Sequence, residues 1–403
     1  MHDKIKIYLL LLTIVISGCV GTSRLAAVPE TRTYSANVLG IDNVRFWPTH
    51  EDDSFTTIVM DAIDRSSINL NPENNGQSRN ANLVLSSGGD GGAFSAGLLV
   101  GWSAAGNRPK FSFVTGISTG ALIAPFAFLG PDYDDTLRYI YTNISTKNVY
   151  RLNVLGALFS DATADSAPLA GLIERYIDDA LLKRIAEEYS NGRLLLIGTT
   201  NLDARLPVMW NMGAIASSKH PEAPNLFRKI LLASASVPSL LPPVMIEVES
   251  SGAVYHEMHV DGGITEQVYA YPDWISQKYF DGKYKRFMED HQTDLYVIWN
   301  SRMQPEWSQV ERQTMKIGHS TIEAMTHSLG KRDIHRIFIQ AKRDGINFNL
   351  AAIDTDFRDK NQMGFDTAYM RALFEYGYKK ALNGYPWKKI PPGLLGRKTD
   401  HLK

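Results

Sequence analysis

Ser118 is the residue whose surroundings most clearly suggest chemistry. It lies in the run FSFVTGISTGALIAP, which starts at Phe111, with glycines two positions before and two positions after it. The residues 111–115 are aromatic and β-branched and predict a buried strand, whereas the residues after Gly120 predict a helix. Gly116 and Gly120 permit a tight turn between the two. This G-x-S-x-G pattern makes Ser118 a candidate nucleophile, although a glycine-rich turn without chemistry would fit the same five residues.

A second glycine-rich turn is predicted earlier in the chain. A short apolar strand from Asn82 runs into SGGDGG (87–92) and then into a helix. This layout points free backbone N–H groups at an anion. A P-loop would require a lysine, and a dinucleotide fingerprint would require a small residue at Phe94, so neither fits. The remaining interpretation is an oxyanion hole, which would lie beside Ser118 if the two strands are parallel neighbours.

The group that would accept the proton of Ser118 is not an evident histidine. In a Ser-His-Asp hydrolase the acid and then the histidine follow the serine along the chain. A strand predicted over 254–260 places His256 and His259 on opposite faces and ends at Asp261, followed by two glycines that admit another backbone. A plain Asp-Gly turn would fit the same residues. We interpret the eight histidines after Ser118 as ordinary surface or core residues: His220, His256, His259, His291, His319, His327, His335 and His401.

Together these segments resemble the signatures of the patatin-like phospholipase family. The family has a glycine-rich block before a helix, then G-x-S-x-G, then D-G-[GA]; this chain has SGGDGG at 87–92, GISTG at 116–120 and DGG at 261–263, in that order. The resemblance extends over roughly residues 83 to 274. It implies an α/β fold, a three-layer α/β/α sandwich with a mostly parallel sheet. Three further stretches also resemble the family: Asp165–Leu169, Thr200–Asp203 and Ala233–Pro243.

The resemblance also implies roles for individual residues. Ser118 would be the nucleophile and Asp261 the base of a dyad without histidine, and the amides of Gly88, Gly89 and Thr119 would hold the oxyanion. Because a free aspartate has a pKa of about 3.9 and is a poor base, Asp261 must be desolvated and within hydrogen-bond reach. Asp165 and Asp203 are expected to hold loops. The implied enzyme is a serine acyl hydrolase that cleaves carboxylic esters of (phospho)lipids, with no cofactor and no metal.

One position departs from the family pattern. Most members carry arginine or lysine where Gly91 stands here, and Ser87 replaces the first glycine of the block. Backbone amides bind an oxyanion, so the departure bears on phospholipid head-group binding more than on hydrolysis. The alternatives are a short-chain carboxylesterase or lysophospholipase, or a catalytically silent lipoprotein that binds lipid or a partner.

The N-terminus predicts a lipid anchor. Lys4 and Lys6 precede an apolar run, 7–16, that is too short to span a bilayer, and Ile-Ser-Gly-Cys at 16–19 resembles the lipobox of bacterial lipoproteins. Cleavage would then leave Cys19 N-terminal and lipidated, with a membrane surface as partner. Val20 follows, rather than the aspartate that retains many such proteins in the inner membrane, so the outer membrane is the expected location.

Composition sets wider limits. The 403 residues include 44% hydrophobic residues, 42 Lys+Arg against 43 Asp+Glu, and one cysteine. A sizeable core is expected, nucleic acid is not an expected partner, and an internal disulfide is excluded.

The order of predicted elements divides the chain into regions. A helix is predicted at 54–66, and the ordered core is expected to begin at Ala81. Other helices are predicted at 169–189, 225–236, 309–342 and 366–382, and further strands at 193–199 and 294–299. The predicted regions are a signal peptide (1–18), a tether and arm (19–82), a catalytic core (83–274), strand and helices completing the fold (275–385) and a basic tail (386–403).

Overall fold

The computed structural model describes residues 24–68, 80–153, 161–275, 282, 285, 291–305, 307, 309–359 and 364–394. The predicted signal peptide, Cys19 and the last part of the basic tail lie outside these residues. Among the residues described, no helix has both the length and the apolar character needed to cross a membrane.

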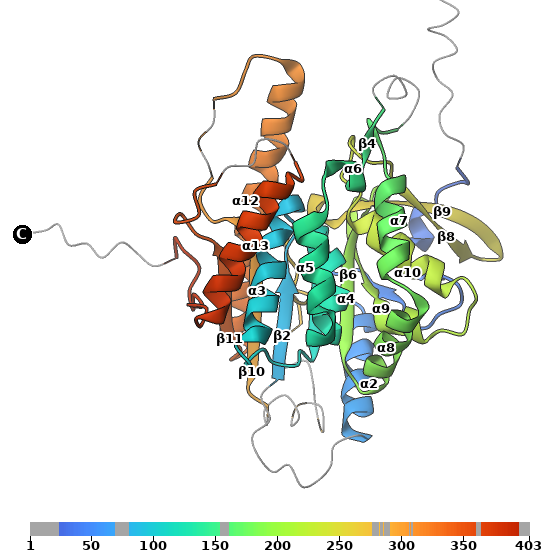
Figure 1. Ribbon diagram of the computed structural model, residues 1–403. Helices are drawn as coiled ribbons and strands as arrows, with labels where there is room; N and C mark the ends of the chain where they lie inside the picture. Colours follow the sequence, from blue (N-terminus) through green and yellow to red (C-terminus); the bar gives the residue numbers. More distant parts are fainter. Residues whose placement is uncertain are drawn as a thin grey trace, which may run out of the picture.

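A sheet of nine strands forms the centre of the described fold (Figure 1). Five strands, in the order β6-β3-β2-β10-β11, are parallel, and β7, β1, β9 and β8 extend the sheet beyond β6 in antiparallel pairings. We call the edge at which the five parallel strands end the carboxyl edge. The strands are β1 (Arg45–Phe46), β2 (Asn80–Leu85), β3 (Phe113–Ile117), β6 (Leu194–Asn201), β7 (Leu206–Asn211), β8 (Val244–Ser250), β9 (Ala253–Asp261), β10 (Thr293–Arg302) and β11 (Asn347–Ile353), while β4 (Arg151–Leu152) and β5 (Ala164–Asp165) form a separate ribbon.

Helices cover both faces of the sheet because successive strand side chains point to opposite faces. Leu83 and Leu85 pack into one apolar cluster with Phe374, whereas Val84 between them packs into another with Ile334. The prediction of a three-layer α/β/α fold is confirmed. The helices are α2 (Ser54–Ile68), α3 (Gly92–Ala104), α4 (Thr119–Leu129), α5 (Asp134–Asn143), α6 (Thr146–Val149), α7 (Ala167–Tyr176), α8 (Asp179–Ser190), α9 (Met212–Ser217), α10 (Ala223–Ser234), α12 (Thr314–Arg343) and α13 (Thr367–Leu382).

The N-terminal arm belongs to the core, so the expectation that ordered structure begins at Ala81 is wrong. Arg45 and Phe46 form β1 and pair with β7. Phe46 packs with Phe55 and Ile58 of α2 in an apolar cluster beneath β3 and β6. In the sequence alone, Arg45 and Phe46 do not belong to a periodic pattern long enough to predict this packing.

The helix predicted over 169–189 is two helices. The chain leaves α7 at Ile177, and the carboxylate of Asp178 accepts a hydrogen bond from the amide of Leu181 at 2.8 Å, which caps α8. An aspartate is among the best residues at this position because it satisfies an amide that the helix itself cannot. The break between α7 and α8 could therefore have been predicted from the sequence.

Candidate active site

Ser118 lies on a strained turn between β3 and α4. Its backbone has φ 56° and ψ −122°, a conformation that costs a non-glycine residue on the order of 1–3 kcal/mol. The two flanking glycines allow this turn, because a Cβ on Gly116 would lie 2.4 Å from the carbonyl oxygen of Gly120. A Cβ on Gly120 would lie 2.5 Å from the carbonyl oxygen of Leu85. The predicted nucleophile turn is thus present, and both glycines are sterically required.

Asp261 lies next to Ser118 because strand β6 changes its neighbouring strand at this point, from β3 to β9. β3 pairs with β6 as far as Ile117, opposite Gly198; at the next residue of β6, Thr199, the neighbour is Asp261 of β9. The Asp261 carboxylate accepts a hydrogen bond from the hydroxyl of Ser118. The structure therefore brings together the serine and the aspartate that the sequence singled out.

The environment of Asp261 raises its basicity. Its side chain is buried, and burial raises its pKa to about 6, against the smaller effects of the hydrogen bonds from the Ser118 hydroxyl and the Gly263 amide. The Gly263 amide is 2.7 Å from Oδ1 of Asp261 and fixes the carboxylate, while the Asp261 amide donates to the carbonyl of Ser236 at 2.9 Å. An aspartate with a pKa near 6 is charged at pH 7 and still basic enough to act on a hydroxyl.

This pKa predicts the pH dependence of the reaction. A general base acts only when deprotonated, so kcat/KM for a soluble ester should rise with pH, be half-maximal near pH 6 and level off above about pH 7. The measurement is kcat/KM of p-nitrophenyl butyrate hydrolysis between pH 4.5 and 8. Activity that falls through pH 6 as pH rises would assign the essential group as an acid and contradict the role of Asp261.

The glycine-rich block lies beside Ser118, after β2. Gly88 and Gly89 have φ 146° and 55°, values that favour glycine, and among the described residues neither amide donates to an acceptor. Thr119 is the first residue of α4, where amides lack an intrahelical partner. Gly89, Ser118 and Thr119 line the same cavity. Two of the three residues predicted to bind an oxyanion, Gly89 and Thr119, thus lie in the cavity wall with Ser118, and Gly88 precedes Gly89 in the chain.

Asn300 of β10 explains the departure at Gly91. A Cβ on Gly91 would lie 2.1 Å from the carbonyl oxygen of Asn300, so no larger residue fits in this backbone. Asn300 is buried; its backbone amide donates to the hydroxyl of Ser86 and its side-chain amide to the carbonyl of Ser86, each at 2.9 Å, and it accepts from Ser95 at 2.5 Å. Asn300 thus holds the residues on either side of the block, Ser86 and Ser95, by neutral hydrogen bonds, and leaves no room for a cationic side chain at position 91. No local pattern in the sequence indicated this residue.

An apolar cavity opens beside the serine on the α4 face of the sheet. Ser118, Thr119 and Gly89 lie in its wall, and none of its 22 lining residues is charged. The apolar walls come from α4, α5, α7 and α10, together with Phe365 and Met370 from the C-terminal part of the chain. Such a cavity suits an extended hydrocarbon chain whose carbonyl end lies at Ser118.

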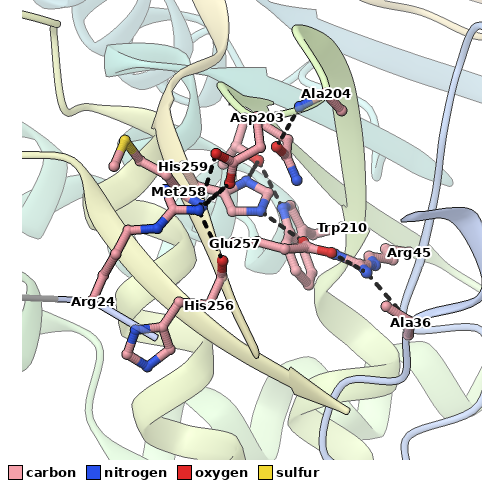
Figure 2. Close-up of polar contacts among 12 residues, drawn as sticks. Arg24, Ala36, Arg45, Asp203, Ala204, Trp210, His256, Glu257, Met258 and His259 are labelled. Atoms are coloured by element: carbon pink, nitrogen blue, oxygen red, sulfur yellow. Dashed lines mark hydrogen bonds and ion pairs between the residues drawn. The ribbon is translucent and has the colours of Figure 1, made fainter. Parts of the chain in front are cut away.

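His259 has hydrogen-bond partners that exclude it as the base. It is buried, with Nδ1 2.9 Å from the Thr199 hydroxyl and Nε2 3.0 Å from the Glu257 carboxylate (Figure 2). The Glu257 carboxylate can only accept, so Nε2–H donates to it; Nδ1 of the neutral ring then accepts from the Thr199 hydroxyl, which itself accepts from Nε1 of Trp210 at 2.8 Å. Burial lowers the pKa of His259, although Glu257 opposes this, which keeps the ring neutral. Both ring nitrogens are occupied away from Ser118.

Arg45 completes this buried network. Its guanidinium is 2.5 and 2.9 Å from the two oxygens of Glu257. Burial would raise the pKa of Glu257, but Arg45 and His259 outweigh it and lower that pKa to about 2. The arm is therefore tied to β9, the strand that carries Asp261. The network was not predicted, because Arg45, Thr199 and Trp210 are far in the sequence from Glu257 and His259.

The other predicted polar residues hold loops. Asp203 accepts from Arg24 at 2.9 Å and from the Met258 amide at 3.3 Å (Figure 2), and Asp165 accepts from the amide of Ala167 at 2.9 Å. His256 is partly exposed and accepts from the amide of Leu25 at 3.2 Å, on the opposite face of β9 from His259, as the alternation predicted. His401 and Cys19 lie outside the described residues.

Ser118 lies on a strand-to-helix turn, is hydrogen-bonded to a buried aspartate and faces an uncharged apolar cavity. This is the arrangement of a lipid hydrolase domain. Residues 83–272 match the sequence profile of the family described as patatin-like phospholipase, and this part of the chain belongs to that family. Among solved structures, the chain is similar to VipD from Legionella pneumophila, with 10% identity and a TM-score of 0.31 over 76% of this chain and 67% of that chain. A comparison with curated proteins gives no significant match.

Proposed function

We propose that the protein is a serine acyl hydrolase that cleaves carboxylic ester bonds of lipids through an acyl-enzyme. The observation that carries the proposal is the hydrogen bond between Ser118 and the buried Asp261 at the wall of an uncharged apolar cavity. Membership of residues 83–272 in the patatin-like phospholipase family supports a lipid substrate.

The proposed reaction has two halves. In the first, Oγ of Ser118 attacks the ester carbonyl carbon while its proton passes to Asp261, and the amides of Gly88, Gly89 and Thr119 stabilise the oxyanion. The tetrahedral intermediate expels the alcohol, which takes the proton from Asp261. In the second half, water attacks the acyl-enzyme, Asp261 accepts a proton from it, and the fatty acid leaves as Ser118 recovers its proton.

The cavity should set the acyl-chain preference. Leu172 of α7 lines it and is only partly buried, so Leu172→Trp would fill space without removing a core residue. We expect the ratio of laurate to butyrate ester hydrolysis to fall at least about tenfold in this variant, since a long chain no longer fits. Leu172→Met, which conserves volume, is the control and should keep the ratio. An unchanged ratio with tryptophan would place the acyl chain elsewhere.

The choice among lipid substrates is a matter of direct assay. Release of fatty acid from phosphatidylcholine vesicles, from lysophosphatidylcholine and from p-nitrophenyl butyrate separates a phospholipase from a lysophospholipase and from a short-chain esterase. A protein that binds fatty acid but hydrolyses none of the three would be a silent lipid-binding lipoprotein and would contradict the proposed function.

We propose also that Cys19 carries the membrane anchor, in the outer membrane. The support is the sequence alone: a short apolar run that ends in Ile-Ser-Gly-Cys at 16–19. Cys19→Ser should abolish incorporation of a fatty-acid probe, because the thiol that would carry the lipid is gone. Unchanged incorporation in the variant would rule out this anchor, whatever the enzyme activity.

A further inference from the structure

The first half of α12 projects from the carboxyl edge of the sheet, and it contacts the sheet at its end, where Nε2 of His327 lies 3.1 Å from the carbonyl oxygen of Arg302. In the second half, Ile334, Ile337 and Ala341 are fully buried against β10 and β11. Before Leu329, in contrast, most of the side chains described are exposed. This exposed part is about 24 Å long at 1.5 Å per residue, and Figure 1 shows it extending beyond the rest of the fold. We call residues 314–329 the projecting half of α12.

One side of this half carries exposed apolar side chains, with only uncharged residues between them (Thr314, Gly318, Thr321 and Ser328), and we call it the apolar face of α12. Ile317, Ile322 and Met325 are 50%, 51% and 65% exposed. At ~100° per residue they fall within an arc of about 140°, whereas Lys316 and Glu323 lie on the opposite side of the helix. The chain that leads into the helix adds Trp307, 86% exposed, and Val310. Exposed apolar side chains gathered in one place mark a surface that another apolar phase covers.

This apolar surface lies at the same edge as the active site. β10 is parallel to β2, and β2 to β3, so β10 ends at Arg302 on the carboxyl edge where Ser118 follows β3. The residues between Arg302 and α12 therefore start from that edge. Leu152, 67% exposed, also lies near the cavity, two residues after Tyr150 in its wall.

The N-terminal part of the chain reaches this edge too. Arg24, the first residue described, pairs with Asp203, which follows the carboxyl end of β6 (Figure 2). Cys19 is five residues before it, a span of at most ~18 Å in extended chain. A lipid on Cys19 would hold the carboxyl edge, with the active site and the apolar face of α12, close to a bilayer.

We infer that Trp307, Val310 and the apolar face of the projecting half of α12 bind the surface of a lipid bilayer and turn the cavity toward it. The inference deepens the proposed function and rests on it for its lipid substrate. Aliphatic side chains on one helix face with charges on the other, and an exposed tryptophan in the chain before the helix, suit the boundary between head groups and acyl chains. The bilayer then supplies the ester to a cavity that lies at the same edge as the contact.

Trp307 provides a local test of this contact. The full chain, carrying Ser118→Ala to prevent hydrolysis, is reconstituted in phosphatidylethanolamine–phosphatidylglycerol vesicles with or without brominated acyl chains. Bromine should quench a component of tryptophan fluorescence that disappears in Trp307→Phe and persists in Trp387→Phe. Equal quenching in wild-type chain and Trp307→Phe would overturn the inference. Shielding of Trp307 that depends on protein concentration and not on lipid would assign the face to a second copy and also overturn it.

A kinetic test separates this inference from the proposed function. With Ser118 intact, the triple variant Ile317→Ser, Ile322→Ser, Met325→Ser should hydrolyse a long-chain ester in vesicles at least tenfold more slowly and p-nitrophenyl butyrate in solution at the normal rate. Ile339→Ser, an equally exposed site on the buried half of the same helix, is the matched control and should change neither rate. Normal hydrolysis in vesicles by the triple variant would overturn the inference, whereas absence of both activities in the wild-type chain would contradict the proposed function.

Discussion

Alanine at position 118 is expected to lower ester hydrolysis by at least about 10⁴-fold, the largest effect of any single substitution in this chain. The substitution removes the oxygen that attacks the carbonyl carbon, and no neighbouring group can replace it. The amide of residue 118 still donates to Ser234 Oγ at 3.0 Å, and Ser234 to the carbonyl of Gly198 at 2.6 Å, so the turn retains its support. The measurement is the rate of p-nitrophenyl butyrate hydrolysis by purified protein.

The control for this variant is its fold. Circular dichroism and the thermal midpoint of Ser118→Ala should match those of the wild-type chain, since alanine tolerates the same φ of 56° no better and no worse than serine. A folded Ser118→Ala protein that keeps a tenth or more of the activity would show that the nucleophile is another residue.

Asparagine at position 261 is expected to lower turnover by about 10³-fold or more. The side-chain amide of asparagine has nearly the shape of the aspartate carboxylate. Its oxygen can still accept the hydrogen bond from the backbone amide of Gly263, which in the wild-type structure is 2.7 Å from Oδ1 of Asp261. It cannot accept a proton from Ser118. The loss should therefore be in kcat, with little change in stability, and is measured by steady-state hydrolysis together with thermal unfolding.

His259→Gln is the matched comparison for Asp261→Asn. Both residues are buried on β9, two positions apart, but His259 contacts Thr199 and Glu257 rather than the nucleophile. We expect this variant to keep most of its activity, although it should lose some stability because a buried hydrogen-bond network is disturbed. Glutamine at each of the other seven histidines after Ser118 should also leave most activity. A folded histidine variant as inactive as Ser118→Ala would require a triad and contradict the dyad.

The sequence predicted the parts of the site that are local. The turn at Ser118 depends on glycines two residues away, and the end of β9 depends on the alternation that places His259 and Asp261 on one face. Tight turns and strand periodicity are determined by a few adjacent residues. The order of the three signatures along the chain was then enough to indicate which turns meet at the carboxyl edge.

The features of the site that were not predicted depend on contacts between segments that are distant in the sequence. Asn300 crowds Gly91 from β10, and Arg45 reaches Glu257 across 212 positions of sequence. The cavity is lined by residues of six helices, α4, α5, α6, α7, α10 and α13, and by Phe365, whose φ of 56° no local sequence pattern predicts. A single sequence specifies such contacts only through the whole fold, so these residues could not be predicted, whereas the capped start of α8 at Asp178 could have been.

The most direct test of the central claim is the site of covalent labelling by a fluorophosphonate, which reacts with an activated serine and traps it as a stable phosphonyl ester. The wild-type chain is labelled, digested and mapped by mass spectrometry, with Asp261→Asn treated in parallel. The account predicts one added phosphonyl group per chain, located on the peptide that contains Ser118, and much slower labelling in Asp261→Asn. Labelling of another serine, or rapid labelling of Ser118 without the Asp261 carboxylate, would contradict it.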